Sequence, residues 1–151
     1  MVSKLFNIIR PDRAFFGLKD YQQYLLIKQL VKDLVFEIEI IGIEIERESD
    51  GLAVSSRNAY LTAEEREIAP FLYACLNDVA TAILNNDRDY RRLEKEGLQK
   101  LQEAGFHPDY FSICHAETLQ SANAKDDSIV LLAAVTLGSC RLIDNLRIKI
   151  A

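Results

Sequence analysis

Residues 14–25 read AFFGLKDYQQYL, a short apolar run that ends at a glycine and passes into residues with helical spacing. The run Ala14-Phe15-Phe16 is typical of a strand, and Gly17 suits a tight turn after it. From Tyr21 onward, the apolar side chains recur at the three- and four-residue intervals of a helix. The order predicts a strand, a turn and a helix.

Elements of the same kind are predicted on both sides of this stretch. Between Phe36 and Ile45, apolar and acidic residues alternate with the period of a half-buried strand. Residues 2–9 have helical spacing, and Pro11 stops that helix. We interpret this region as the end of an alternating α/β unit. Because the first helix starts without a capping residue, we expect further chain upstream.

The residues after about position 47 predict a different architecture. Asp50-Gly51 is a turn signal, and Thr62 with Glu65 fits a capping box. The capping box would open a long helix that ends near Leu84, with Pro70 as an awkward residue inside it. A second helix is expected from Tyr90 to Gly105, with Pro108 after its end.

Three strands are expected after these helices, over residues 110–114, 129–137 and 141–148. The Gly138-Ser139 pair fits a turn between the last two of them. Residues 47–151 are therefore predicted to form a small α+β domain with two helices and a three-stranded antiparallel sheet.

Composition restricts the function classes. The chain has 151 residues and a net charge of −5, with both signs interspersed, so it lacks the basic face that nucleic-acid binding requires. Its longest apolar stretch, residues 129–137, is shorter than the roughly 20 residues of a membrane span. No secretion signal is present. We expect a cytoplasmic protein, without a membrane or nucleic-acid partner, whose three cysteines are ordinary thiols.

The turn Gly17-Leu18-Lys19-Asp20 is the first candidate binding site. Free backbone amides and the dipole at the start of a helix attract anions, and Lys19 adds a positive charge. The alternative is structural: Gly17 forms a turn, Asp20 caps the helix and Lys19 is solvated. These four residues alone do not decide between the two interpretations.

The loop Ser55-Ser56-Arg57-Asn58 is the second candidate site. It offers two hydroxyls, a guanidinium and an amide, a set of donors that can hold polyphosphate oxygens. No general base accompanies either serine, so neither is expected to act as a nucleophile. The alternative is turn chemistry that precedes the helix at Thr62. His107 and His115 have no metal-site spacing, and no metal site is predicted.

Five blocks in order resemble the pantothenate synthetase family. They are Val2-Ser3-Lys4-Leu5-Phe6-Asn7, Pro11-Asp12-Arg13, Phe16-Gly17-x-Lys19-Asp20-Tyr21-Gln22-Gln23, Asp50-Gly51-Leu52-Ala53-x-Ser55-Ser56-Arg57-Asn58 and Arg141-Leu142-Ile143-Asp144-Asn145. The likeness extends over essentially the whole chain. It implies that residues 1–46 are the C-terminal part of a Rossmann-like nucleotide-binding domain, and that residues 47–151 are the family's C-terminal domain.

The resemblance also implies a reaction. In this family, pantoate attacks the α-phosphorus of ATP, which carries Mg²⁺, to give pantoyl adenylate, and beta-alanine then displaces AMP. Charge stabilisation would come from Lys19 and Arg57, and hydrogen bonds to the leaving pyrophosphate from Ser55 and Ser56.

The remaining implied contacts divide between the two substrates. Gly17, Leu18 and Asp20 belong to the implied ATP site. Val54 and the main chain at Glu46 would touch the nucleotide or pantoate, and Gln23 would bind pantoate. A homodimer is implied as well.

Three departures from the family pattern bear on this assignment. Leu18 replaces a residue that is usually polar, and Glu44 and Glu46 replace proline and an apolar residue. An inward carboxylate at Glu46 would weaken ATP binding by repulsion. The family's His-x-Gly-His motif does not occur in this sequence. We therefore expect the chain to be the C-terminal half of a ligase and to be inactive alone.

The residues are also compatible with two other function classes. The chain could be a dimerisation or interaction module without chemistry, with the strand at residues 129–137 in its interface. It could also derive from another adenylate-forming nucleotidyltransferase, such as a tRNA synthetase. The acidic net charge and the absence of a basic surface weigh against the synthetase.

Overall fold

The computed structural model describes residues 1–150, which divide into two compact units. The N-terminal unit comprises Met1–Ile45, and the C-terminal unit starts at Glu46. The division lies one residue before the boundary expected after residue 46.

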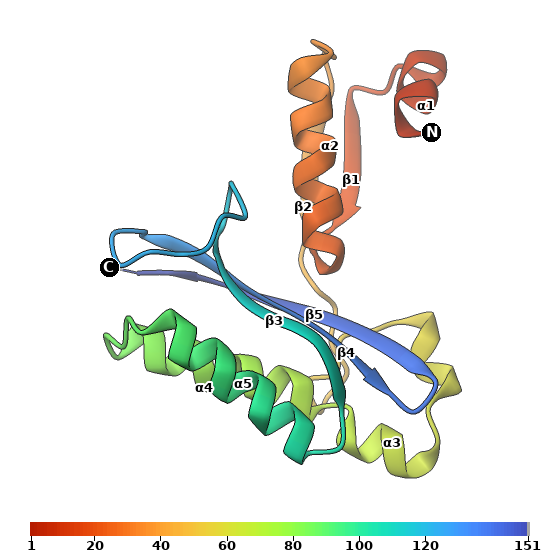
Figure 1. The fold of residues 1–151 in the computed structure, drawn as a ribbon. Helices are drawn as coiled ribbons and strands as arrows, with labels where there is room; N and C mark the ends of the chain where they lie inside the picture. Colours follow the sequence, from red (N-terminus) through yellow and green to blue (C-terminus); the bar gives the residue numbers. More distant parts are fainter. Residues whose placement is uncertain (151) are drawn as a thin grey trace. The chain divides into compact units, whose positions relative to one another are not determined.

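The N-terminal unit has the predicted order of helix, strand, turn, helix and strand. Its elements are α1 (Val2–Ile9), β1 (Arg13–Gly17), the 3₁₀ turn η1 (Leu18–Asp20), α2 (Tyr21–Asp33) and β2 (Glu39–Ile43). β1 and β2 pair in parallel, with Phe15 opposite Ile41, and α2 is the connection between them (Figure 1). The alternating α/β order predicted for this region is confirmed.

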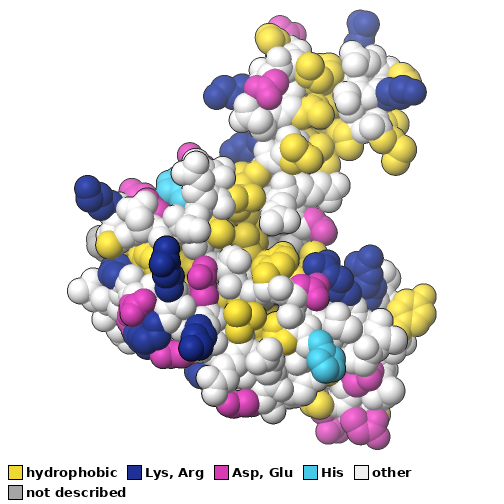
Figure 2. Space-filling view, in the orientation of Figure 1, with side chains coloured by type: hydrophobic (Ala, Val, Ile, Leu, Met, Phe, Trp, Pro, Cys, Tyr) yellow, Lys and Arg dark blue, Asp and Glu magenta, His cyan; other side chains and the backbone are white. Residues whose placement is uncertain are grey.

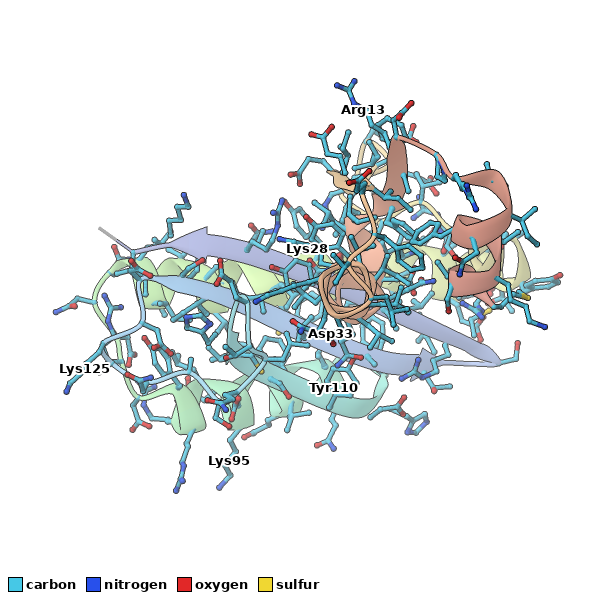
Figure 3. The ribbon with its side chains drawn as sticks, turned by 90° about the horizontal axis from the view of Figure 1, so that it is seen from above. Arg13, Lys28, Asp33, Lys95, Tyr110 and Lys125 are labelled. Atoms are coloured by element: carbon cyan, nitrogen blue, oxygen red, sulfur yellow. The ribbon has the colours of Figure 1, made fainter. Side chains whose placement is uncertain are left out.

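Apolar surface remains exposed on this small unit. Phe6 is buried and meets Phe36 edge to face, with ring centroids 5.9 Å apart. By contrast, Ile8, Phe15 and Val35 are 78%, 62% and 84% exposed, and Figure 2 shows hydrophobic side chains on the surface of this unit. Arg13, which pairs with Glu39 at 2.9 Å, points away from the strands (Figure 3). The core of this unit is small.

The C-terminal unit is a layer of helices on one face of an antiparallel sheet (Figure 1). Its elements are η2 (Ser56–Tyr60), α3 (Ala63–Ile68), α4 (Phe71–Leu84), α5 (Tyr90–Glu103), β3 (His107–His115), β4 (Ser128–Leu137) and β5 (Cys140–Lys149). The strand order is β3-β4-β5, and both pairings are antiparallel. The predicted three-stranded antiparallel sheet is confirmed.

The core lies between the sheet and helices α4 and α5. Alternate residues of β4, including Ile129, Leu131 and Val135, are fully buried in it. Leu76 of α4 and Leu101 of α5 are also fully buried in this cluster. Because apolar surface removed from water contributes about 25 cal/mol per Å², this cluster is the main source of stability in the unit.

Two details of the C-terminal unit differ from prediction. The long helix expected from Thr62 to Leu84 is two helices, because Pro70 lacks an N–H and starts α4 as its N-cap. The capping box is confirmed, with reciprocal bonds of 3.2 and 2.9 Å between Thr62 and Glu65. Pro108 does not precede the strand but lies inside β3, where the register shifts before Tyr110.

One helical stretch among residues 1–150, Ala63–Leu84, is long and apolar enough to cross a membrane by length and composition alone. Its α4 segment buries Leu72, Leu76 and Ile83 in the core beneath the sheet. The core helix of a globular domain meets the same criterion of length and composition, so the stretch is weak evidence of a membrane span.

Candidate functional site

The glycine turn leaves open space beside its backbone. Gly17 ends β1 in an extended conformation with φ −65°, so a positive φ does not require glycine there. A Cβ at this position would meet no atom within 4 Å. The missing side chain therefore leaves room for a ligand to approach the amides at the start of η1 and α2.

The side chain of Leu18 anchors this turn to β2. Leu18 is 3% exposed, and a Cβ on Gly42 would lie 2.7 Å from its Cδ2 atom. The Leu18 side chain therefore fills the space that a side chain on Gly42, in the neighbouring strand, would take. Because this side chain is buried, it does not face a ligand, which gives the departure from the usual polar residue a structural explanation.

The other residues of the turn lie at the N-terminus of α2. Asp20 occupies the N-cap position, but its side chain makes no capping hydrogen bond. The alternative in which Asp20 is the N-cap is therefore confirmed in position, without a side-chain hydrogen bond. Lys19 is half-buried, and Gln23 is exposed in the first turn of α2. Both lie within four residues of the helix start, where the dipole favours anions.

A hairpin over residues 46–54 precedes the second candidate loop. Val54 N donates to Glu46 O at 2.9 Å, and Arg47 pairs with Ala53 across the hairpin. Gly51 has φ +93°, which confirms the predicted turn at Asp50-Gly51. Glu46 is exposed and Val54 is 47% exposed, so both can contact a ligand at the edge of the hairpin.

The Ser55–Arg57 loop continues from this hairpin into η2. Ser55 Oγ accepts from Arg57 N at 3.3 Å, as the turn interpretation requires, but its hydroxyl proton is still available to donate. Ser56 and Arg57 are exposed. Cys140 Sγ lies 3.5 Å from Arg57 O, and Asn58 Nδ2 donates to Ala53 O at 3.2 Å. The backbone is fixed while the donor side chains face solvent.

The predicted residues thus form two groups. Gly17, Leu18, Lys19, Asp20 and Gln23 lie together in the N-terminal unit, whereas Glu46, Val54, Ser55, Ser56 and Arg57 lie together in the C-terminal unit. In each group, backbone or hydroxyl donors accompany one cation. Both groups are suited to anionic oxygens.

Sequence reasoning missed an ion pair beside the second group. Arg47 Nη1 and Nη2 lie 2.6 and 2.9 Å from the two carboxylate oxygens of Asp144, which is 4% exposed. Asp144 falls between Leu142 and Leu146, at a position of β5 that faces the core. A carboxylate at a core-facing position requires a cationic partner, and this signal was available in the sequence.

The histidines and cysteines form no further site. His115 Nδ1 accepts from Glu117 N at 3.2 Å and stabilises a turn. The three cysteines are free and buried, and burial raises the pKa of the Cys75 thiol to about 11. Within residues 1–150, no three His, Cys, Asp or Glu residues gather as metal ligands.

Residues 1–147 match the family model described as pantoate-beta-alanine ligase. The chain is 51% identical over 150 residues to the pantothenate synthetase of Pseudomonas fluorescens, a match that covers 99% of this chain and 52% of that protein. It is 52% identical to the pantothenate synthetase of Neisseria meningitidis serogroup C, with 99% and 54% covered.

Solved structures agree with these matches. The pantothenate synthetase of Thermus thermophilus is similar with a TM-score of 0.89 and 38% identity, over 96% of this chain and 52% of that one. A pantoate-beta-alanine ligase from Francisella tularensis, complexed with beta-gamma ATP and beta-alanine, has a TM-score of 0.70 and 34% identity, over 96% and 47%. The chain spans about half the length of the curated relatives it matches.

Proposed function

The chain belongs to the pantoate-beta-alanine ligase family, and we propose that it supplies part of the site at which such a ligase joins pantoate to beta-alanine with ATP. The observation that carries the proposal is the match over residues 1–147, because it includes both groups of candidate residues. The Francisella tularensis relative, which is complexed with beta-gamma ATP and beta-alanine, supports the same substrates here.

The proposed reaction has two steps. A carboxylate oxygen of pantoate attacks the α-phosphorus of ATP, and the bond to pyrophosphate breaks. The amine of beta-alanine then attacks the acyl carbon of pantoyl adenylate, loses a proton and releases AMP. Both steps move negative charge onto phosphate oxygens, so positioned donors and cations give the protein's main contribution.

Each group has a role in this scheme. Lys19 and Arg57 stabilise charge, while Ser55 and Ser56 donate to the departing pyrophosphate. The main chain of Gly17, Leu18 and Asp20 binds phosphate oxygens at the start of α2. Gln23 orients pantoate through its amide. Glu46 and Val54 border the nucleotide, with the exposed Glu46 carboxylate directed to solvent.

Magnesium would enter with ATP as a phosphate-bound ion. The described residues 1–150 offer no cluster of three metal-ligating side chains, so they do not fit a metal held by this chain itself. No step is assigned to the ion. A cytoplasmic location and a homodimer remain predictions.

Activity is proposed to require residues beyond these 151. The relatives are about twice as long, and their ATP-binding His-x-Gly-His motif, implied by the resemblance, does not occur in this sequence. We expect no pantothenate formation by the chain alone. Turnover by the purified chain would refute this part of the proposal.

To test the proposal, the half of the Pseudomonas fluorescens relative that this chain does not match is joined to the chain in one polypeptide. The joined protein should form pantothenate, and Arg57→Gln should lower kcat about 100-fold or more, as loss of a charge-stabilising donor does. Arg92→Gln is the matched control, since the ion pairs of Arg92 with Asp87, Asp89 and Glu96 lie at the surface. A folded joined protein that neither binds ATP nor forms pantothenate would contradict the proposal.

A further inference from the structure

The geometry assigns Arg47 a positioning role in nucleotide binding. We propose that its pairing with Asp144 fixes the hairpin 46–54 on the C-terminal unit and thereby fixes the Ser55–Arg57 loop that follows. ATP affinity would then depend on a residue that does not touch ATP. The inference rests on the proposed function, because it takes residues 55–57 as a loop that contacts the nucleotide.

The contacts of Arg47 join three separate parts of the C-terminal unit. Its guanidinium pairs with both oxygens of Asp144 on β5 at 2.6 and 2.9 Å. It also donates to Gly51 O at 3.0 Å, and its Cζ lies 3.6 Å from the ring centroid of Tyr73 on α4. One planar group thus connects the hairpin turn, a strand and a helix.

The hairpin is itself a tightly connected segment. Glu48 N donates to Leu52 O, and Gly51 N donates to Glu48 O, both at 2.9 Å. Its turn also packs on Tyr73, because a Cβ at Gly51 would lie 2.8 Å from the Cδ1 atom of that ring. A displacement of Arg47 would therefore displace the hairpin as a whole.

The hairpin passes directly into the candidate loop. The backbone of Val54 is hydrogen-bonded to that of Glu46, and the next residue, Ser55, starts the loop. Asn58 Nδ2 donates back to Ala53 O at 3.2 Å, so the far side of the loop is also held by the hairpin. The exposed donors of Ser56 and Arg57 consequently take their position from residues 46–54.

Arginine is required for this arrangement, not just a positive charge. Lysine could neutralise the buried carboxylate of Asp144, but a single ammonium cannot also reproduce the two-pronged pairing, the bond to Gly51 and the flat stacking on Tyr73. Arg47→Lys therefore removes the positioning while it keeps the buried charge compensated. This substitution separates a positioning role from a general role in folding.

The test measures hydrogen–deuterium exchange of the full chain, wild type against Arg47→Lys. Amides of residues 53–58 should exchange at least about tenfold faster in the variant, as expected when local bonds are lost. Amides of β4 should keep their protection, which shows that the core is intact. Arg92→Lys is the matched control at an arginine with surface ion pairs only and should change neither region. Unchanged exchange at residues 53–58 in folded Arg47→Lys would overturn the proposal.

The second arm measures the KM for ATP and kcat of the joined protein, in which the chain is fused to the missing half of the Pseudomonas fluorescens relative. Arg47→Lys should raise the KM for ATP about tenfold while kcat at saturating ATP falls less than about threefold. An unchanged KM would overturn the proposal even if the exchange is faster. If the wild-type joined protein does not bind ATP, the proposed function fails, and with it the link to ATP, while the exchange data still decide whether Arg47 fixes the loop.

Discussion

The buried carboxylate of Asp144 requires a cationic partner elsewhere in the chain. Its carboxylate is 4% exposed at a position of β5 that otherwise carries apolar side chains. Burial without a partner would be prohibitive for a charged group, so the arginine at position 47 and the bond from Asn145 N at 2.8 Å accompany it. The ion pair fixes the position of Arg47 relative to β5. A buried ion pair can do this without a net gain in stability, because desolvation of both charges offsets their attraction.

This distinction predicts a non-additive pair of substitutions. Arg47→Met should destabilise the C-terminal unit by about 3–5 kcal/mol, because it leaves the Asp144 carboxylate buried and unpaired. Adding Asp144→Leu should recover most of that loss, since no buried charge then remains. Urea unfolding of the two single variants and the double variant measures the coupling. If the double variant lost as much unfolding free energy as the two single variants together, the two residues would act independently.

Asp50 gives a prediction at the surface of the same hairpin. The hydrogen bond from Arg66, at 2.6 Å, lowers the pKa of Asp50 below its usual value, with help from Leu52 N. A pKa lower in the folded state than in the unfolded state means stabilisation above the unfolded pKa of about 3.9, lost as the pH falls through the folded value.

The test compares urea midpoints of wild type and Asp50→Asn from pH 6 down to pH 2. Asparagine can still accept from Leu52 N, so the change removes the charge and leaves the turn bond. The wild type should be more stable near pH 6, and the difference should shrink toward pH 2. A difference that grows on acidification would have the wrong sign for a lowered pKa.

At the scale of elements, residue patterns predicted type and order well. Helical spacing, the alternation after Phe36 and the turn at Gly51 each depend on neighbours in sequence, and all three are present. Pro70 is predicted inside one long helix, because sequence alone does not show whether one helix ends and another begins at a proline. The strand predicted over residues 110–114 is present, but its start at His107 is not predicted, because a register shift that tolerates Pro108 depends on the partner strand.

The candidate site was predictable in part for the same reason. The Gly17–Asp20 turn and the Ser55–Arg57 loop are continuous segments, so their donors could be recognised from sequence. The ion pair of Arg47 joins residues 97 positions apart and required the hairpin and β5 to be placed together. Its acidic member was visible as a carboxylate at a core-facing strand position, but its partner was not.

Gly97 tests how tightly helix and sheet are packed. It lies in α5, and a Cβ there would be 3.1 Å from three ring atoms of Phe111. Alanine should gain about 1 kcal/mol in helix propensity, but overpacking against a ring that is 3% exposed should cost about 1–3 kcal/mol. Gly97→Ala is therefore expected to lower the unfolding free energy, measured by urea denaturation.

The matched control for this prediction is Lys95→Ala on the same helix. Lys95 is exposed and points away from the packed face (Figure 3), so its replacement should change stability by less than about 0.5 kcal/mol. A more stable Gly97→Ala variant would show that the Phe111 ring can move away from the new methyl group, and that the gain in helix propensity exceeds the cost of overpacking.

At the scale of the molecule, the two units differ in how much core each contains. The buried apolar residues of the N-terminal unit are Phe6, Leu18, Tyr21 and Ile27. Its sheet is a single parallel pair, and parallel strands usually require both faces to be covered. The C-terminal unit has a continuous core between three strands and the helices α4 and α5. Stability should therefore be concentrated after Glu46.

This asymmetry predicts different behaviour when the units are separated. Residues 46–151 alone should fold and unfold cooperatively in urea, because their core is built within the unit. Residues 1–45 alone should show no cooperative transition, because a two-stranded sheet with exposed Ile8, Phe15 and Val35 buries too little apolar surface to offset chain entropy. Circular dichroism and the dispersion of amide NMR signals measure both outcomes. A cooperative transition in residues 1–45 would show that β1, α2 and β2 stabilise one another without further partners.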